Sequence, residues 1–343
     1  MTWRPTSSDA SNQTGNDGMS DGTVRNMRAS ANPIAENDSA SLWDLGSGVA
    51  CFEVHTKMNA LDVQALEILQ HAIAIAGDTF GALVIGNDDP RAFSVGADLA
   101  YNHAMVSRGD WAALATYFKK GQDLYQALAA LRVPVVAAAH GFALGGGCEI
   151  MLHSHAVVAD AGFRGGLPEI KVGLIPAWGG CTQLLLRCVE RLGPEDGLAH
   201  ALAVLQAGEI ATSAQQSEAM GLLRPGTPVV ADRSALLPTA VDKAKAMMAE
   251  GFTPPPPPTI TYCGEAARAE QRQRVDADVA AGSLDPNGAV VMRDIIDALT
   301  GWPTVRQKGE HPIAVSLAGE LVGAARLIRT PAALAAITKL IGG

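Results

Sequence analysis

The sequence has few aromatic residues and no closely spaced pair of cysteines. Phe, Trp and Tyr make up 5% of the 343 residues, whereas hydrophobic residues of all kinds make up 48%. A core built mainly from Ala, Leu and Val is typical of helices packed on sheets, and it disfavours an aromatic-rich β-sandwich. The five cysteines form no C-x-x-C motif and are odd in number, which favours a reduced, cytoplasmic protein.

An excess of positive charge and a long apolar run are also missing. The formal net charge of −9 disfavours nucleic acid or an anionic membrane as a partner, because both need a basic surface. The most apolar stretch, Val133–Gly147, is shorter than the ~20 residues that a membrane span requires, and it contains His140. No apolar leader stands at the N-terminus. We therefore expect a soluble protein.

Several familiar catalytic fingerprints are absent. The sequence has no G-x-G-x-x-G, no P-loop and no G-x-S-x-G, which disfavours a Rossmann dinucleotide site, a nucleotide triphosphatase and a serine hydrolase. His153 and His155 are two residues apart without a third ligand or an H-E-x-x-H pattern, so we expect no metal site.

Composition divides the chain into three parts. Residues 1–40 are rich in Ser, Asn, Asp, Gly and Thr and bury too little apolar surface to offset their ordering entropy, which predicts a flexible tail. Residues 41–250 alternate short apolar runs with helical patterns, which predicts an α/β domain with right-handed crossovers. Residues 251–343 begin with the extended Pro254–Pro258 segment and continue as helical stretches, which predicts a linker and a helical C-terminal module.

Periodicity places the individual elements within these parts. Apolar runs predict strands at 49–54, 82–85 and 133–139, and helical spacing predicts helices over 60–76, 110–131, about 264–281, 287–299 and 314–341.

The first candidate site segment is the turn Phe93–Leu99, which follows the predicted strand at 82–85. Gly96 permits a backbone conformation closed to other residues, so the turn could aim the N–H of Ala97 into a cleft. Taken alone, the segment also fits an ordinary loop.

The second candidate segment is Gly145–Glu149, between a predicted buried strand and an apolar helical run. Unpaired N–H groups at the start of a helix, together with the helix dipole, favour an anion there. Glu149 follows Gly146 by about one helical turn, so its carboxylate could share a cleft with the Gly146 N–H. Close packing of the helix on the strand is the alternative interpretation.

The third candidate is Glu169, which lies between apolar neighbours just before a loop rich in glycine and proline at 173–180. A surface turn is the alternative. The spacing between Glu149 and Glu169 does not give their distance in space.

Together and in this order, the three segments resemble the crotonase superfamily of enoyl-CoA hydratases and isomerases, over about residues 42–193. Additional segments are similar to the C-terminal hydratase domain of bacterial fusion proteins that carry a 3-hydroxyacyl-CoA dehydrogenase. These segments are Leu42–Gly46, Lys57–Ala60, Gly173–Ala177 and Arg329–Pro331. The dehydrogenase half is not in this sequence, so we expect no NAD-linked activity.

The resemblance implies an α/β fold, a crotonase-like spiral of ββα turns with a C-terminal helical extension, assembled as a trimer or a dimer of trimers. It implies an oxyanion hole made by the N–H groups of Ala97 and Gly146. It also implies that Glu149 and Glu169 hold and activate a water. CoA belongs to the substrate, so no separate cofactor is implied.

The same resemblance assigns the acyl-CoA contacts to two short segments. Their residues are Lys57, Met58, Ala97, Asp98, Leu99 and Ala100. Ala100 stands where the family often has a basic residue, which would remove a contact to a CoA phosphate unless Lys57, Arg91 or Lys171 replaces it. Trp178 stands in a loop that is usually made of small residues, which predicts a narrowed acyl pocket.

These implications lead to a hydratase that adds water to a trans-2-enoyl-CoA, giving a 3-hydroxyacyl-CoA in fatty-acid β-oxidation. A Δ3-Δ2-enoyl-CoA isomerase of the same fold is the nearest alternative. It needs one base, so two glutamates favour hydration. A non-catalytic acyl-CoA-binding subunit of a dehydrogenase complex is the third interpretation. The oxyanion turns and glutamates disfavour it, and a 3-hydroxyacyl-CoA dehydrogenase partner stays open.

Overall fold

The computed structural model describes residues 32–342, and its centre is a sheet of seven strands. The strands run in the order β1 (Ala35–Glu36), β2 (Ala40–Asp44), β3 (Val49–Val54), β5 (Ala82–Ile85), β8 (Val135–Ala139), β10 (Ala156–Asp160) and β12 (Val229–Val230). The pairs β1–β2 and β2–β3 are antiparallel and all later neighbours are parallel. The strands expected at 49–54, 82–85 and 133–139 are confirmed, the last of them beginning just after Pro134.

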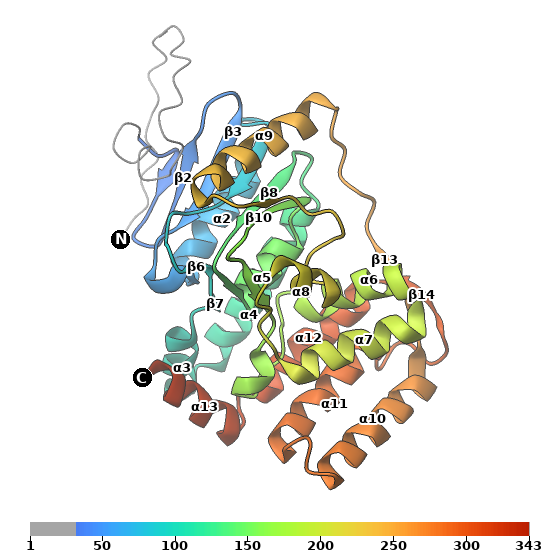
Figure 1. The fold of residues 1–343 in the computed structure, drawn as a ribbon. Coiled ribbons are helices and arrows are strands. Elements are labelled where there is room, and N and C mark those ends of the chain that lie inside the picture. The colour runs from blue at the N-terminus through green and yellow to red at the C-terminus, as the bar shows by residue number, and fades with distance from the viewer. Residues whose placement is uncertain (1–31, 343) are drawn as a thin grey trace, which may run out of the picture.

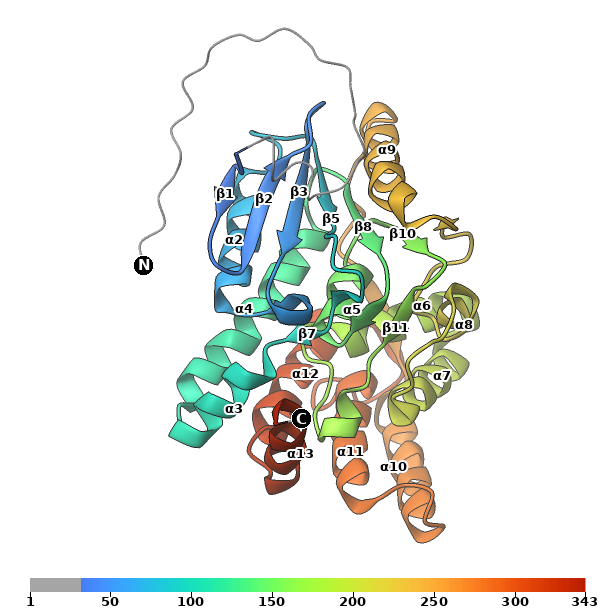
Figure 2. The same cartoon turned by 60° about the vertical axis from the view of Figure 1, so that its left-hand side comes forward.

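A smaller parallel sheet lies beside the first (Figures 1 and 2). Its strands are β6 (Ala92–Ser94), β9 (Phe142–Leu144) and β11 (Arg164–Gly166), in the order β11-β9-β6. Each follows a strand of the large sheet along the chain, and a helix then returns to the next turn. This repetition is the spiral of ββα turns that the crotonase resemblance implies.

Helices cover the sheets. They are α2 (Val63–Ile75), α3 (Leu99–Arg108), α4 (Trp111–Ala129), α5 (Gly146–Leu152), α6 (Gly180–Leu192), α7 (Pro194–Ala207), α8 (Ala214–Ala219) and α9 (Leu236–Ala249). Alternate strand residues point to opposite faces of the large sheet. One set, which includes Val49, Cys51 and Val84, packs on α9, whereas the other, which includes Phe52 and Leu83, belongs to the main core.

The last residues of the predicted tail, up to the boundary at residue 41, belong to the folded structure. Strand β1 pairs with β2, and Ala40 at the start of β2 is fully buried. The remainder of the predicted tail, residues 1–31, lies outside the described residues.

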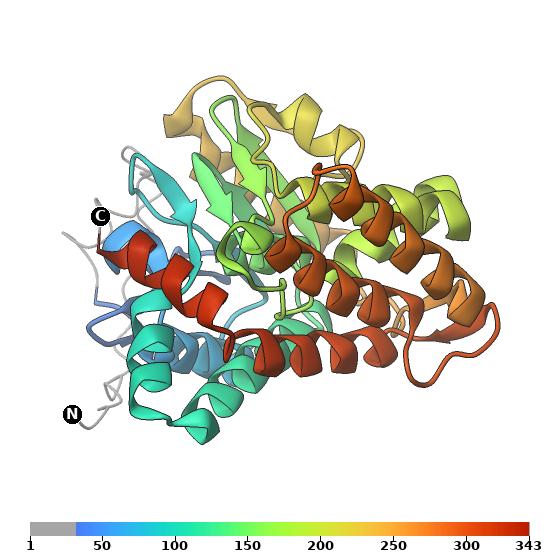
Figure 3. The ribbon, with the colours of Figure 1, turned by 90° about the horizontal axis from the view of Figure 1, so that it is seen from below.

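The C-terminal part is packed onto the rest of the chain. After the Pro-rich segment it contains β13 (Thr259–Tyr262), α10 (Gly264–Ala280), α11 (Pro286–Thr300), β14 (Gly309–Pro312), α12 (Ala314–Leu327) and α13 (Pro331–Ile341). The single stretch expected at 314–341 is two helices, because Thr330 caps a new helix that starts at Pro331. Figure 3 shows α12 and α13, in red, beside the teal helices α4 and α3, and their buried residues belong to the same core.

Within residues 32–342, no single helix has both the length and the apolar content to cross a membrane. Helices α12 and α13 reach that length only as a pair, and they meet at 81°. The same residues contain no group of three or more His, Cys, Asp and Glu side chains arranged to hold a metal ion.

Candidate active site

The first predicted oxyanion turn is held by the segment that contains Lys57 and Met58. That segment forms the short helix η1 (Lys57–Asn59) and continues into β4 (Ala60–Leu61), which pairs in parallel with β7 (Gly96–Ala97). The Val95 N–H donates to the Met58 carbonyl at 3.2 Å. The two segments predicted to contact CoA therefore lie next to each other.

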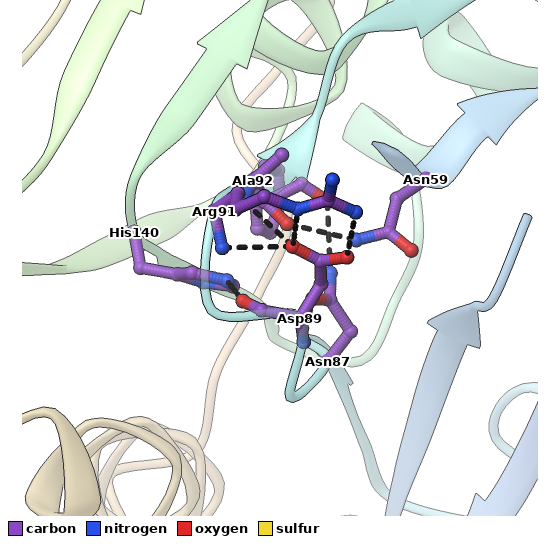
Figure 4. A network of polar contacts seen from close by, with 7 residues as sticks. Asn59, Asn87, Asp89, Arg91, Ala92 and His140 are labelled. Carbon is purple, nitrogen blue, oxygen red and sulfur yellow. Dashed lines mark hydrogen bonds and ion pairs between the residues drawn. The ribbon is translucent and has the colours of Figure 1, made fainter. Parts of the chain in front are cut away.

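A polar network fixes the strand that leads into this turn (Figure 4). Asp89 accepts the N–H groups of Arg91 at 2.7 Å and Ala92 at 3.2 Å, and Asn59 donates to the Ala92 carbonyl at 2.8 Å. The His140 ring donates to the Asp89 carbonyl at 2.9 Å. Burial lowers the pKa of His140 to about 4, so this ring is neutral at neutral pH. Arg91, a candidate for a CoA phosphate contact, forms an ion pair with Asp89.

The second predicted oxyanion donor lies against the first. Gly146 is the first residue of α5, so its N–H has no carbonyl one turn earlier in the helix. A β-carbon built on Gly146 would lie 3.2 Å from the Ala97 amide nitrogen, and one built on Gly96 would overlap the Gly146 amide nitrogen. Gly96 also has φ = 88°, a conformation that favours glycine. The geometry thus brings the backbone amides of Ala97 and Gly146 together, as an anion site requires.

Glu149 extends from the first turn of α5 into a loop of backbone donors. Its side chain is buried, and its Oε1 accepts the N–H groups of Trp178 at 2.8 Å and Gly180 at 2.7 Å. Desolvation raises the pKa of Glu149 to about 7, although the two N–H bonds act in the opposite direction.

Glu169 begins the short helix η2 (Glu169–Val172) and faces the same region. A β-carbon built on Gly145 would lie 2.9 Å from its Oε1, which places this carboxyl group beside the start of α5. Its Oε2 is buried and has no hydrogen-bond partner among residues 32–342. Desolvation, and next the charge of Glu149, raise the pKa of Glu169 well above its usual range. The structure therefore brings together the two glutamates whose proximity the sequence leaves undetermined.

A third buried carboxyl group belongs to Glu320 on α12, which is not among the site residues predicted from the sequence. Its Oε1 accepts the Thr182 N–H at 2.7 Å and hydroxyl at 2.6 Å, and its Oε2 accepts the Gly179 N–H at 2.8 Å. Burial and the charge of Glu149 raise the pKa of Glu320 to about 8. The available signal was a lone acidic residue in the otherwise apolar helical stretch 314–325.

Trp178 fills the space between this loop and α4. Its ring packs edge-on against Tyr117 and Tyr125, with centroid distances of 5.4 and 5.3 Å. A β-carbon on Gly146 would lie 2.8 Å from the ring, and one on Gly121 would overlap it. The indole therefore reaches the backbone of a predicted oxyanion donor.

The remaining predicted CoA contacts follow the first oxyanion turn. Asp98 caps α3 by accepting the Ala100 and Tyr101 N–H groups at 2.8 and 3.2 Å, and Leu99 is the first residue of that helix. Lys57 and Lys171 are both exposed.

Residues 45–253 match the family described as enoyl-CoA hydratase/isomerase, which is more than half of the chain. The chain belongs to this family. The crotonase resemblance derived from the three segments is confirmed, and so is the similarity to dehydrogenase-linked proteins.

Among curated proteins, this enoyl-CoA hydratase/isomerase family member is 30% identical over 233 residues to the probable 3-hydroxyacyl-CoA dehydrogenase of Bacillus subtilis (strain 168), covering 68% of this chain and 29% of that protein. It is 38% identical over 157 residues to a putative fatty acid oxidation complex trifunctional enzyme of Rickettsia felis, covering 45% of this chain and 21% of that protein. The chain spans less than a third of the length of these two relatives.

Solved structures with the same fold include a carnitinyl-CoA dehydratase from Mycobacterium thermoresistibile, with a TM-score of 0.65, 16% identity and coverage of 89% of this chain and 90% of that one. An enoyl-CoA hydratase from Bacillus halodurans gives a TM-score of 0.60 at 15% identity, covering 88% and 100%. At these identities the likeness shows the fold alone.

Proposed function

We propose that this family member hydrates trans-2-enoyl-CoA thioesters to 3-hydroxyacyl-CoA. The observation that carries the proposal is the convergence of two buried carboxyl groups, Glu149 and Glu169, on the start of α5, where the backbone amides of Ala97 and Gly146 meet. Hydration of a conjugated thioester needs a base for water, an acid for C2 and donors for the thioester oxygen.

The paired amides would act on the thioester oxygen. As water attacks C3, the C2–C3 π electrons move toward the carbonyl and negative charge develops on that oxygen. Two preorganised N–H donors stabilise this enolate, and loss of one donor in comparable sites costs about 3 kcal/mol.

The environments of the two glutamates suggest their roles. Glu149 accepts two backbone N–H bonds, which favour its charged form, and its pKa of about 7 allows it to take a proton from water at neutral pH. Glu169 has a buried, unpartnered oxygen beside the Glu149 charge, so it would hold its proton and deliver it to C2. One turnover leaves Glu149 protonated and Glu169 ionised, and proton exchange between them or with water restores the starting state.

Isomerisation of a 3-enoyl-CoA to a 2-enoyl-CoA is the second candidate. It would use one carboxyl group to move a proton between C2 and C4, and the unpartnered oxygen of Glu169 fits such a base. Retention of a second carboxyl group in the same region favours hydration.

The biological setting is part of the proposal. Curated relatives carry dehydrogenase and fatty-acid-oxidation names, and a 3-hydroxyacyl-CoA dehydrogenase would consume the hydration product. We therefore propose that the chain acts in fatty-acid β-oxidation in the cytoplasm beside such a partner, as a homo-oligomer of the trimer type.

The deciding experiment follows loss of the conjugated-thioester absorbance with trans-2-enoyl-CoAs of increasing chain length. Wild type, Glu149→Gln, Glu169→Gln and the exposed control Glu67→Gln are compared, and a 3-enoyl-CoA is tested for gain of the same absorbance. Hydration requires rapid loss in wild type and the control but not in the two site variants. Gain from the 3-enoyl-CoA without hydration of the 2-enoyl-CoA would instead establish the isomerase.

A further inference from the structure

The loop that begins at Ala177, together with the start of α6 up to Thr182, lies between two buried carboxyl groups that accept from alternate N–H groups. Trp178 and Gly180 donate to Glu149 at 2.8 and 2.7 Å. Gly179 and Thr182 donate to Glu320 at 2.8 and 2.7 Å. The loop therefore has one carboxylate on each side, and displacement of either would move the donors of the other.

Glu320 is held in place from several directions. It is fully buried, and no ion pair to it occurs in the described part of the chain. The Thr182 hydroxyl donates to it at 2.6 Å. From α4, the Gln122 amide nitrogen lies 3.5 Å from its Oε2 and donates to the carbonyls of Ala177 and Leu317 at 2.9 and 3.0 Å. Gln122 thereby joins the loop, α4 and α12.

We propose that Glu320 is a positioning residue for Glu149, by which the C-terminal helix α12 completes the active site of the N-terminal part. The inference rests on the proposed function of Glu149. It assigns a role to a segment that lies outside the family match at residues 45–253. Glu320 accepts the Gly179 and Thr182 N–H groups and so fixes the loop whose Trp178 and Gly180 N–H groups hold Glu149.

Removal of the Glu320 anchor has a defined effect on the pKa of Glu149. Glu320 has a pKa of about 8, so it is neutral where Glu149 titrates, and its replacement acts through the loop. The Trp178 and Gly180 N–H bonds lower the pKa of Glu149, so their weakening raises it. Gly179 and Thr182 donate to different oxygens of Glu320, and glutamine places an NH2 group, which accepts no hydrogen bond, at one of these two positions. The loop would lose one anchor, and Glu149 would be less well oriented.

The other titratable groups that face this pair do not interfere near neutral pH. Desolvation, followed by the charges of Glu149 and Glu320, raises the pKa of Glu169. The Cys181 thiol, Tyr125 from α4 and Tyr262 from β13 also have raised pKa values, because all three are desolvated. They stay neutral where Glu149 titrates. On α5, burial raises the pKa of the Cys148 thiol and lowers that of the His153 ring to about 4, so both are also neutral there.

The test compares wild type with Glu320→Gln and with Glu270→Gln, which makes the same substitution at an exposed position of the C-terminal part. We expect Glu320→Gln to lower kcat at least tenfold with a smaller change in KM, and to move the acidic limb of kcat/KM to higher pH, because the N–H bonds that lower the pKa of Glu149 weaken. The Glu270 variant should behave as wild type. An unshifted limb, or a loss of activity that only parallels lower thermal stability, would overturn the proposal.

Thr182 supplies a second variant and a rescue. Thr182→Val removes the hydroxyl donor but keeps the N–H, and we expect an intermediate fall in kcat that Thr182→Ser restores. NMR titration of the Glu149 carboxyl carbon measures the protonation of this group without turnover. Its signal is assigned by its absence from the spectrum of Glu149→Gln. Its titration midpoint should move to higher pH in Glu320→Gln. If wild type hydrates no enoyl-CoA while this midpoint moves, the proposed function fails and the coupling stands, whereas an unmoved midpoint overturns the coupling.

Discussion

Gly96 and Gly146 approach so closely that a β-carbon on Gly96 would overlap the Gly146 amide nitrogen and lie 2.8 Å from the Leu144 carbonyl oxygen. The two residues come from different turns of the spiral, β7 and the start of α5. Both the left-handed φ of Gly96 and the absence of its side chain are needed for this contact. The geometry of the proposed oxyanion hole therefore depends on one glycine.

Gly96→Ala should separate the two amides. We expect kcat to fall by about 10²–10³-fold, as on loss of an oxyanion donor. Gly282→Ala is the matched control, because Gly282 has φ = 73° with open space around its would-be β-carbon. It carries the backbone cost of about 1–2 kcal/mol without the overlap. Equal activity of the two variants in steady-state kinetics would contradict the assignment.

Glu149→Gln should abolish most of the activity while preserving the fold. A glutamine oxygen can still accept the Trp178 and Gly180 N–H groups, since one carboxylate oxygen accepts both in the structure. Loss of the base should lower kcat by about 10²–10⁴-fold. Circular dichroism and thermal melts should match those of wild type, and unfolding of the variant would remove the support for a catalytic role.

The parts of the site that local patterns encode are predictable from the sequence. Gly96, Gly146 and Glu149 stand in short segments for which spacing predicts a strand, a turn and a helix in that order. The structure has these elements in the predicted order. The proximity of Glu169 to Glu149 depends on how η2 packs against α5, which no local pattern contains. Its raised pKa is likewise a property of the folded site.

The C-terminal part shows the limit of composition as a guide. A polyproline segment and separate helices predict an appended module, yet these helices share the core of the N-terminal part. The role of Glu320 follows from long-range packing of α12 on α4 and α6. In sequence, that residue is a single acidic position among apolar ones.

The buried carboxyl groups should make stability depend on pH in a defined direction. Below the unfolded pKa of 4.5, folded and unfolded chains both hold the Glu320 proton, and its contribution to stability is fully present. As pH rises toward about 8, the unfolded chain releases this proton while the folded chain retains it, so stability is lost across that window. Glu320→Gln should flatten this fall in the free energy of unfolding. Urea titrations at several pH values test it, and identical slopes for both proteins would refute it.

The effect of Gly121→Ala on the free energy of unfolding should change sign when Trp178 is replaced by alanine. A β-carbon on Gly121 would lie 2.6 Å from Cδ2 of the indole, so Gly121→Ala should destabilise the wild-type protein. Trp178→Ala leaves a cavity and should cost about 3–5 kcal/mol by itself. In that background the overlap is gone, and alanine in the interior of α4 should stabilise the protein by up to about 1 kcal/mol relative to glycine. Denaturant titration of the four proteins measures the coupling.

Trp178→Ala also tests the predicted narrowing of the acyl pocket. Because the indole touches Gly146, its removal should open space beside the thioester site and raise kcat/KM for longer enoyl-CoAs relative to crotonyl-CoA. Trp111→Ala, which removes a tryptophan from the start of α4, is the control. Trp111 stacks on Arg329, so its replacement should leave the chain-length profile unchanged. An unchanged profile in Trp178→Ala would show that the ring supports the loop without bordering the acyl chain.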